Sequence, residues 1–226
     1  MNLNAVEHNN KLGVSAYQFQ HQGSRGSAAR YLAPAIESLQ PQLHQGMRVL
    51  DVGCGNGYWA GQYAARGCTV VGIDPSTSGI EQARKAHPNV RFEEDIVTVD
   101  LIDRLGEQPF DLVFSSEVVE HLYSPATWAE ACYAACQPGG TVLCTTPYHG
   151  YLKNLAIALT GKFDHHWQPL REGGHVKFFS EATLSRLLRD AGFVNVRMKG
   201  AGRWPFLWRS MVMRADRPGN VSTTEV

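Results

Sequence analysis

Residues 47–57 read MRVLDVGCGNG, and this stretch decides the fold. Met47 to Val52 form the continuous apolar run of a buried strand, and a glycine-rich turn follows at once. Residues 58–66 then show helical spacing, which Gly67 ends. A strand, a glycine turn and a helix in this order indicate the first unit of a parallel α/β sheet.

The same rhythm continues along the chain. Further strands are expected at 68–73, 90–94, 111–115 and 141–146, and two last strands at 193–198 and 208–213. Helices are expected at 76–87 and 125–136, and a third begins after Ser180 and ends at Gly192. We therefore predict an α/β fold, in which seven strands form a mostly parallel sheet with helices on both faces and an antiparallel edge hairpin.

The rhythm also divides the chain into regions. Residues 1–46 are expected to form an N-terminal helical cap, and residues 47–214 the main domain. Within that domain, residues 147–178 break the alternation and are predicted to be a lid-like insertion. Residues 215–226 are expected to form a flexible tail.

Composition excludes several classes of protein. The chain has 226 residues, 43% of them hydrophobic, which argues against a fibre or a disordered tail. Lys plus Arg and Asp plus Glu number 21 each, so nucleic acid is not a favoured partner. Five cysteines without a C-x-x-C pair, no signal-like start and no apolar run of about 18 residues favour a cytoplasmic protein without an integral membrane segment. A homo-dimer is compatible with the sequence, which does not determine the oligomeric state.

Acidic residues follow successive strands. Gly53, Gly55 and Gly57 allow the backbone to approach a ligand, but Tyr58 stands where a dinucleotide fingerprint requires glycine. Asp74 follows the second strand, where a carboxylate can bind the two hydroxyls of a ribose. Asp95 follows the third strand. As an alternative, both aspartates are ordinary helix caps.

Asp95 is expected to accept from an adenine amino group, while Ile96 offers a backbone amide. Together with the glycine turn, these strand ends would converge on one nucleoside with a free ribose diol.

Five motifs in order resemble the class I S-adenosylmethionine-dependent methyltransferases, which have a Rossmann-like fold. They are VLDVGCGNG (49–57), GID (72–74), EDI (94–96), FDLVFSSEVVEHL (110–122) and PGGTVLCTTP (138–147). EVVEHL and the later GGHVKFFSEATLSRLLRDAGF are similar to the ubiquinone-biosynthesis O-methyltransferase-like branch. The resemblance covers roughly residues 28–200 and implies S-adenosyl-L-methionine as cofactor.

The resemblance also implies roles for individual residues. Asp51 would orient the loop and the amino group of the cofactor's methionine, and Glu117 would lie near that methionine. Arg25 and Arg30 are candidates for the cofactor's carboxylate. The remaining positions implied to bind the cofactor are Gly53, Gly55, Gly57, Asp74 with its neighbour Pro75, and Asp95 with its apolar neighbour Ile96.

Methyl transfer from a sulfonium is an in-line displacement that needs alignment and exclusion of water. A phenolic hydroxyl gains from a base, and His121, just after the fourth strand, is the first candidate for it. In the alternative, His121 only caps a helix or positions the substrate. His165, His166 and His175 are the second candidates. These three with Asp164 fit no standard metal spacing, and we predict no metal site.

The leading hypothesis is a methyltransferase acting on a small molecule, most plausibly on a phenolic or quinone-like oxygen. Methylation of an amine or a carbon, and a non-catalytic nucleoside-binding protein, are the alternatives. A nicotinamide-dependent dehydrogenase is disfavoured by Tyr58, and a nucleic-acid methyltransferase by the neutral charge and by Ser115-Ser116-Glu117 after the fourth strand.

Overall fold

The computed structural model describes residues 27–167, 169–171 and 173–220. Seven strands form one sheet in the order β3-β2-β1-β4-β5-β7-β6. The parallel strands are β1 (Arg48–Val52), β2 (Thr69–Ile73), β3 (Arg91–Glu93), β4 (Phe110–Ser116) and β5 (Cys136–Pro147). The strands β6 (Val194–Ala201) and β7 (Ser210–Asp216) are antiparallel, and β7 pairs with β5. The predicted sheet and its edge hairpin are confirmed.

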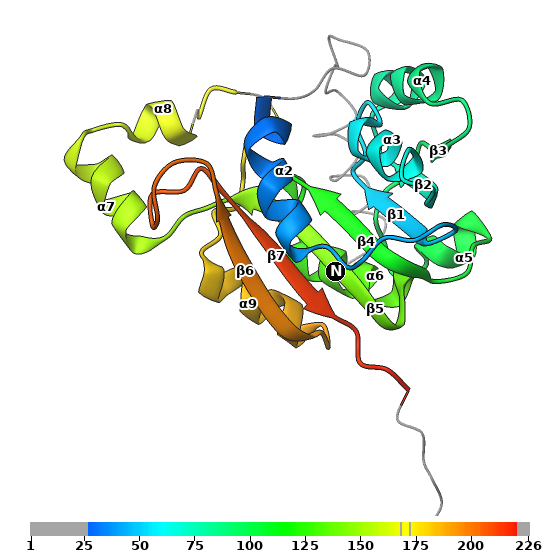
Figure 1. The fold of residues 1–226 in the computed structure, drawn as a ribbon. Coiled ribbons are helices and arrows are strands. Elements are labelled where there is room, and N and C mark those ends of the chain that lie inside the picture. The colour runs from blue at the N-terminus through cyan, green and yellow to red at the C-terminus, as the bar shows by residue number, and fades with distance from the viewer. Residues whose placement is uncertain (1–26, 168, 172, 221–226) are drawn as a thin grey trace, which may run out of the picture.

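Helices cover both faces of the sheet (Figure 1). On one face lie α2 (Ser27–Leu39), α3 (Tyr58–Ala64) and α4 (Thr77–Ala86), whose buried residues pack with Val49, Leu112 and Phe114. On the other lie α5 (Leu101–Leu105), α6 (Pro125–Ala135) and α9 (Glu181–Asp190), packed with Leu50 and Val113. Neighbouring strand residues point to opposite faces, so a run such as RVLDV supplies both cores.

The predicted insertion contains two helices, α7 (Tyr151–Leu159) and α8 (Phe163–Trp167). Its polar end returns to the sheet, where Phe179 forms a single parallel bridge with Tyr148. Ser180 then caps α9 through a capping box with Thr183, which confirms the predicted start of that helix.

Several predicted boundaries differ from those of the structure, including those of β6 and β7 by up to three residues. β5 begins at Cys136 rather than Thr141, because the strand pairs with Phe110 before an irregularity and resumes register at Thr141. Residues 215 and 216, which the prediction assigned to a flexible tail, form the end of β7, and Ala215 is fully buried. Of the predicted N-terminal cap, only residues 27–46 fall within the described part, and α2 is their helix.

Among the described residues, none of the helices has both the length and the apolar character needed to cross a membrane.

Candidate active site

The glycine turn after β1 is tied to the end of β2. The amides of Gly53 and Cys54 both donate to the carbonyl of Ile73, at 2.8 and 2.9 Å. Gly53 has a φ of 74°, and a Cβ there would lie 2.3 Å from a methyl carbon of Val118. The turn therefore requires glycine at this position both for its backbone conformation and for its packing.

Asp74 holds this turn in place. One carboxylate oxygen accepts from the amide of Gly55 at 2.9 Å, and the other from the amide of Ser76 at 2.8 Å. The helix cap of α4 is Ser76, whose hydroxyl accepts from the amide of Gly79, so Asp74 is not the cap of that helix. Each carboxylate oxygen keeps a second lone pair, which leaves Asp74 able to accept from a ligand hydroxyl. Pro75, beside it, is half-buried.

Asp51 lies beneath the turn with one oxygen unsatisfied. The side chain is 1% exposed, and its Oδ2 has no hydrogen-bond partner in the described structure. Burial, and then the charge of Asp74, raise the pKa of Asp51 to about 7. A buried carboxylate oxygen without a donor is suited to bind a cationic ligand group, and the ammonium of the methionine part of S-adenosylmethionine is such a group.

The third acidic position differs from the prediction. Asp95 pairs with Arg104 of α5, at 3.0 Å between Oδ1 and Nη2, and also accepts from the amide of Ile96 at 2.7 Å. The expectation that the Ile96 amide is free for a ligand is therefore wrong, because Asp95 already binds it. The role of Asp95 as acceptor for the adenine amino group would use its remaining lone pairs, and it stays a prediction.

Glu117 follows β4 in a strained conformation, with a φ of 57°. Its Oε1 accepts from the hydroxyl of Thr145 at 2.9 Å. Burial raises the pKa of Glu117 to about 7, against the opposing effects of hydrogen bonds with Thr145 and Ser210 and of the charge of Lys153. Tyr31 of α2 completes this polar group through a 3.1 Å hydrogen bond with the Ser210 hydroxyl.

His121 ends the short 3-10 turn Val119–His121 that follows β4. Its Nδ1 lies 3.2 Å from the carbonyl oxygen of Gly174. A carbonyl can only accept, so this contact assigns the ring proton to Nδ1 and leaves a lone pair on Nε2. Burial lowers the pKa of His121, which keeps the ring neutral near pH 7.

The insertion brings His175 to His121. The amides of Val176 and Lys177 donate to the carbonyl of Glu120 at 2.9 and 3.0 Å. The ring centroids of His121 and His175 are 4.9 Å apart. Burial, followed by the charge of His121, lowers the pKa of His175 to about 4. Glu120 is buried, with one oxygen accepting from Thr146 and the other without a partner in the described structure.

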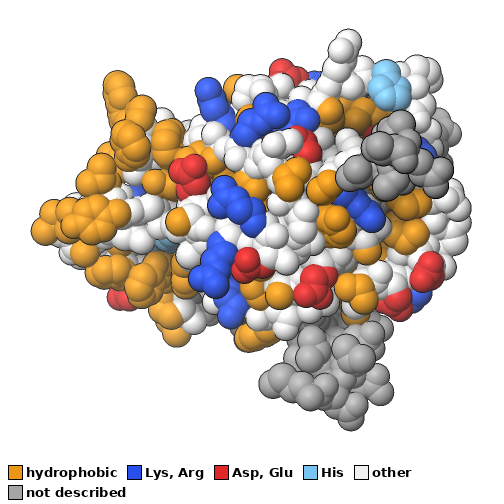
Figure 2. Space-filling model, turned by 90° about the horizontal axis from the view of Figure 1, so that it is seen from below, with side chains coloured by type: hydrophobic (Ala, Val, Ile, Leu, Met, Phe, Trp, Pro, Cys, Tyr) orange, Lys and Arg blue, Asp and Glu red, His pale blue; other side chains and the backbone are white. Residues whose placement is uncertain are grey.

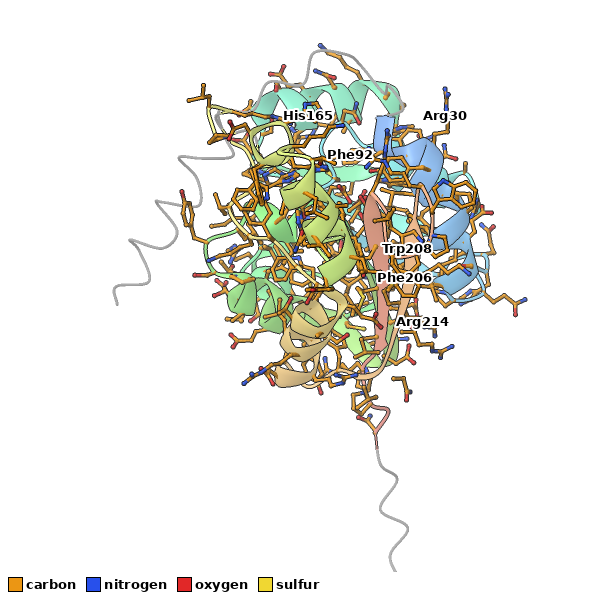
Figure 3. The ribbon with its side chains drawn as sticks, turned by 90° about the vertical axis from the view of Figure 1, so that its left-hand side faces the viewer. Arg30, Phe92, His165, Phe206, Trp208 and Arg214 are labelled. Carbon is orange, nitrogen blue, oxygen red and sulfur yellow. The ribbon has the colours of Figure 1, made fainter. Side chains whose placement is uncertain are left out.

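Ligand atoms of Glu120, His121 and His175 lie within 4.8 Å of one another, so this group, rather than the one around Asp164, has a geometry that could hold a metal ion. His165 lies on α8 and Arg30 lies in α2, and Figure 3 shows both near the top of the view. Arg30 is exposed, and Arg25 lies outside the described residues.

Four residues of this site were not among the predicted ones: Tyr31, Glu120, Lys153 and Ser210. Glu120 stands within the EVVEHL motif, but no spacing signal indicates that Tyr31 and Ser210 meet, because 179 positions separate them.

Comparison with known proteins places the chain in a family. A family model described as a methyltransferase domain matches residues 19–198. A ubiquinone biosynthesis O-methyltransferase of Dinoroseobacter shibae is 36% identical over 163 residues, which are 71% of this chain and 65% of that protein. The protein of the same name from Cereibacter sphaeroides is 32% identical over 193 residues, 82% of this chain and 76% of that protein.

Solved structures agree in fold. A putative methyltransferase of Bacillus halodurans superposes with a TM-score of 0.62 at 16% identity, covering 83% of this chain and 98% of that one. The Synechocystis magnesium protoporphyrin IX methyltransferase with bound SAH gives 0.59 at 19% identity, covering 76% and 75%. From the sequence matches and the fold together, the chain belongs to the methyltransferase-domain family and is a class I S-adenosylmethionine-dependent methyltransferase.

Proposed function

We propose that this protein transfers a methyl group from S-adenosyl-L-methionine to a phenolic or quinone-like oxygen of a small molecule, with His121 as the base. The observation that carries the proposal is the 3.2 Å contact between Nδ1 of His121 and the carbonyl oxygen of Gly174, which leaves the lone pair of Nε2 available to a substrate. The names of the relatives, ubiquinone biosynthesis O-methyltransferases, support an oxygen acceptor.

The cofactor half of the proposal rests on acidic groups around the glycine turn. Among the described residues, no donor reaches the unsatisfied oxygen of Asp51, and the cofactor carries a positively charged amino group and sulfonium. S-adenosylmethionine supplies the activated methyl group. The residues proposed to hold it are Asp51, Gly53, Gly55, Gly57, Asp74, Pro75, Asp95, Ile96 and Glu117.

The acceptor half rests on His121 and its neighbours. Nε2 of His121 would take the proton of the acceptor hydroxyl, while S-adenosylmethionine, when bound, would supply the methyl group by breaking its sulfur–methyl bond as the oxygen–methyl bond forms. The Gly174 carbonyl keeps the ring oriented throughout. The protein otherwise aligns the reactants and excludes water.

The test is production of S-adenosylhomocysteine with a panel of catechols and phenols. His121→Ala should lower kcat by about 100-fold or more, and raising the pH should restore part of it because the hydroxyl then ionises by itself. The matched control is His175→Ala, which removes the neighbouring ring and should cost much less. Turnover unchanged by His121→Ala would refute the base, and activity confined to amine acceptors would refute the oxygen acceptor.

The same panel assayed with EDTA tests the expectation that no metal takes part. Full activity in EDTA agrees with a proton-transfer role for His121. Loss of activity that a divalent ion restores would instead assign Glu120, His121 and His175 to a metal ion.

A further inference from the structure

Helix α7 buries a lysine and exposes its apolar side chains. Lys153 is 5% exposed, and it shares the inner face with Ile157. Tyr151 and Leu159, by contrast, are 78% and 79% exposed. Figure 2 shows hydrophobic side chains gathered at the end of the molecule that carries α7 and α8. Burial of a cation is costly, so packing alone does not explain why Lys153 lies inside.

Lys153 has only one acceptor among the described residues. Its Nζ donates to the carbonyl oxygen of Arg209 at 3.1 Å, and that oxygen also accepts from the amide of Tyr148 at 3.1 Å. No carboxylate of the described residues lies within 4.0 Å of Nζ. An ammonium has three donors, so two N–H groups of Lys153 remain for a ligand.

The surroundings of Lys153 are basic. After burial, the positive charge of Arg203 is the next cause that lowers the pKa of Lys153, to about 8. The charge of Lys153 in turn helps to lower the pKa values of His149, His166 and His175. These groups come from the insertion and from the connection between β6 and β7, which Figures 1 and 3 show beside α7.

Among the residues that the structure describes, Glu117 is the acid that offsets this charge, and it is already hydrogen-bonded. Glu117 raises the pKa of Lys153, but it is not within ion-pair distance and it is hydrogen-bonded to Thr145. The two ends of the site are therefore opposite in character. The cofactor end carries Asp51 and Asp74, and the end formed by α7 carries an unpaired buried cation.

We propose that Lys153, on the inner face of α7, is the centre of an anion-binding subsite for the methyl acceptor, and that the acceptor carries an ionised oxygen group. The inference rests on the proposed function and names the acceptor more closely. The anionic oxygen belongs either to a carboxylate substituent or to a phenolate oxygen other than the one whose proton His121 takes. Both would form charge-assisted hydrogen bonds with the free N–H groups of Lys153.

The experiment is calorimetric titration of the full chain, first with S-adenosylhomocysteine and then, in its saturating presence, with three probes at pH 7. The probes are 3,4-dihydroxybenzoate, which carries a carboxylate, 4-nitrocatechol, in which the nitro group favours the phenolate, and catechol, which is neutral. The variants are Lys153→Met and, as a control with the same change of charge, Lys85→Met. Lys85 is exposed in the last turn of α4, at the opposite end of that helix from Ser76.

At least one anionic probe should bind about tenfold or more tightly than catechol to the wild type and to Lys85→Met. Lys153→Met should abolish this preference and leave catechol binding unchanged. Preference for dihydroxybenzoate identifies a carboxylate as the source of the anion, and preference for nitrocatechol alone identifies the phenolate. If Lys153→Met does not fold, Arg203→Gln, at an exposed position, is the second variant. It should reduce the preference for the anionic probe about threefold.

The outcomes separate the two proposals. Failure of the wild type to bind S-adenosylhomocysteine would refute the proposed function. If S-adenosylhomocysteine binds but neither anionic probe is preferred over catechol, or if the preference survives in Lys153→Met, the anion subsite is refuted and the methyltransferase proposal stands.

Discussion

Binding of S-adenosylhomocysteine should strengthen as the pH rises from 6 to 8, because of Asp51. This carboxyl is buried beneath the glycine turn, has an unsatisfied oxygen and has a pKa raised to about 7 in the free protein. The ligand keeps the positively charged amino group of the cofactor. If that group binds the ionised form of Asp51, only the ionised fraction of the protein is competent to bind.

The size of the effect follows from the pKa. With a pKa of about 7, roughly one-tenth of the molecules are ionised at Asp51 at pH 6, half at pH 7 and nine-tenths at pH 8. The apparent affinity should therefore be about tenfold higher at pH 8 than at pH 6, which corresponds to about 1.4 kcal/mol. Binding at pH 6 should release close to one proton for each molecule of ligand.

Calorimetric titrations at pH 6, 7 and 8, each repeated in two buffers of different ionisation enthalpy, measure both quantities. Asp51→Asn should bind about tenfold more weakly at pH 8 and should lose the pH dependence. A flat profile in the wild type would refute the reasoning. A slope that persists in Asp51→Asn would assign the titration to another group, such as Glu117, whose pKa is also raised to about 7.

The substitution Asp51→Asn should also stabilise the folded protein in the absence of ligand. The folded-state pKa of Asp51 lies above its ordinary value of 3.8, so ionisation in the buried site costs stability once the pH exceeds that value. The cost grows until the pH passes 7 and reaches at most about 4 kcal/mol, at 1.36 kcal/mol per pKa unit. Asp51→Asn should thus raise the free energy of unfolding in urea at pH 8 and leave it nearly unchanged at pH 4.

Three further predictions test the turn and the sheet. Gly53→Ala places a methyl group 2.3 Å from Val118, so it should cost about 2–4 kcal/mol of stability and should weaken cofactor binding. The control Gly139→Ala has a similar φ of 81° but nothing within 4 Å, so it should cost about 1 kcal/mol and leave binding intact. Urea unfolding measures the stability and calorimetry measures the binding. Asp74→Ala removes both acceptors that hold the turn and should weaken S-adenosylhomocysteine binding at least tenfold, so an unchanged affinity would contradict its role. Glu107 is partly desolvated, but hydrogen bonds from two arginines lower its pKa, so its contribution is present above about pH 4.5 and lost as the pH falls; Glu107→Gln should cost about 1 kcal/mol at pH 7 and almost nothing at pH 3.

The strands could be predicted because most of them are apolar on both faces. β1 and β2 lie within one residue of the predicted ranges, since RVLDV and TVVGI supply buried side chains to two helical layers. β5 was harder because Pro138 and Gly139 lie within its irregular first half, where sequence rules indicate a turn. The short helix α5 was missed because five residues give too little periodicity.

The orientation of α7 was not predictable from its pattern. Hydrophobic spacing shows which residues share a face of a helix, but not which face is covered. Here the covered face holds Lys153 and Ile157, and the leucines face outward. The reason lies in a distant segment, because the acceptor for Lys153 is the carbonyl of Arg209, 56 positions away.

The residues of the candidate site likewise fall into those that local sequence predicts and those that depend on distant segments. Residues placed by a strand end, such as Asp51 and Asp74, could be located from local sequence, because parallel strands end at one edge of the sheet. The contact between His121 and His175 could not, because it depends on how a segment more than 50 positions later returns across the site.

The return of this segment across the site is held by ring contacts and by hydrogen bonds to the residues around His121. The amides of Val176 and Lys177 share the single carbonyl of Glu120, and the Nδ1 proton of His121 is bound by the Gly174 carbonyl. At about 1 kcal/mol of net stability for each hydrogen bond, opening these contacts costs only a few kcal/mol, far less than unfolding the sheet. The segment that orients the proposed base is thus joined to it by contacts that must break for the segment to open, so orientation of His121 and access to it are coupled.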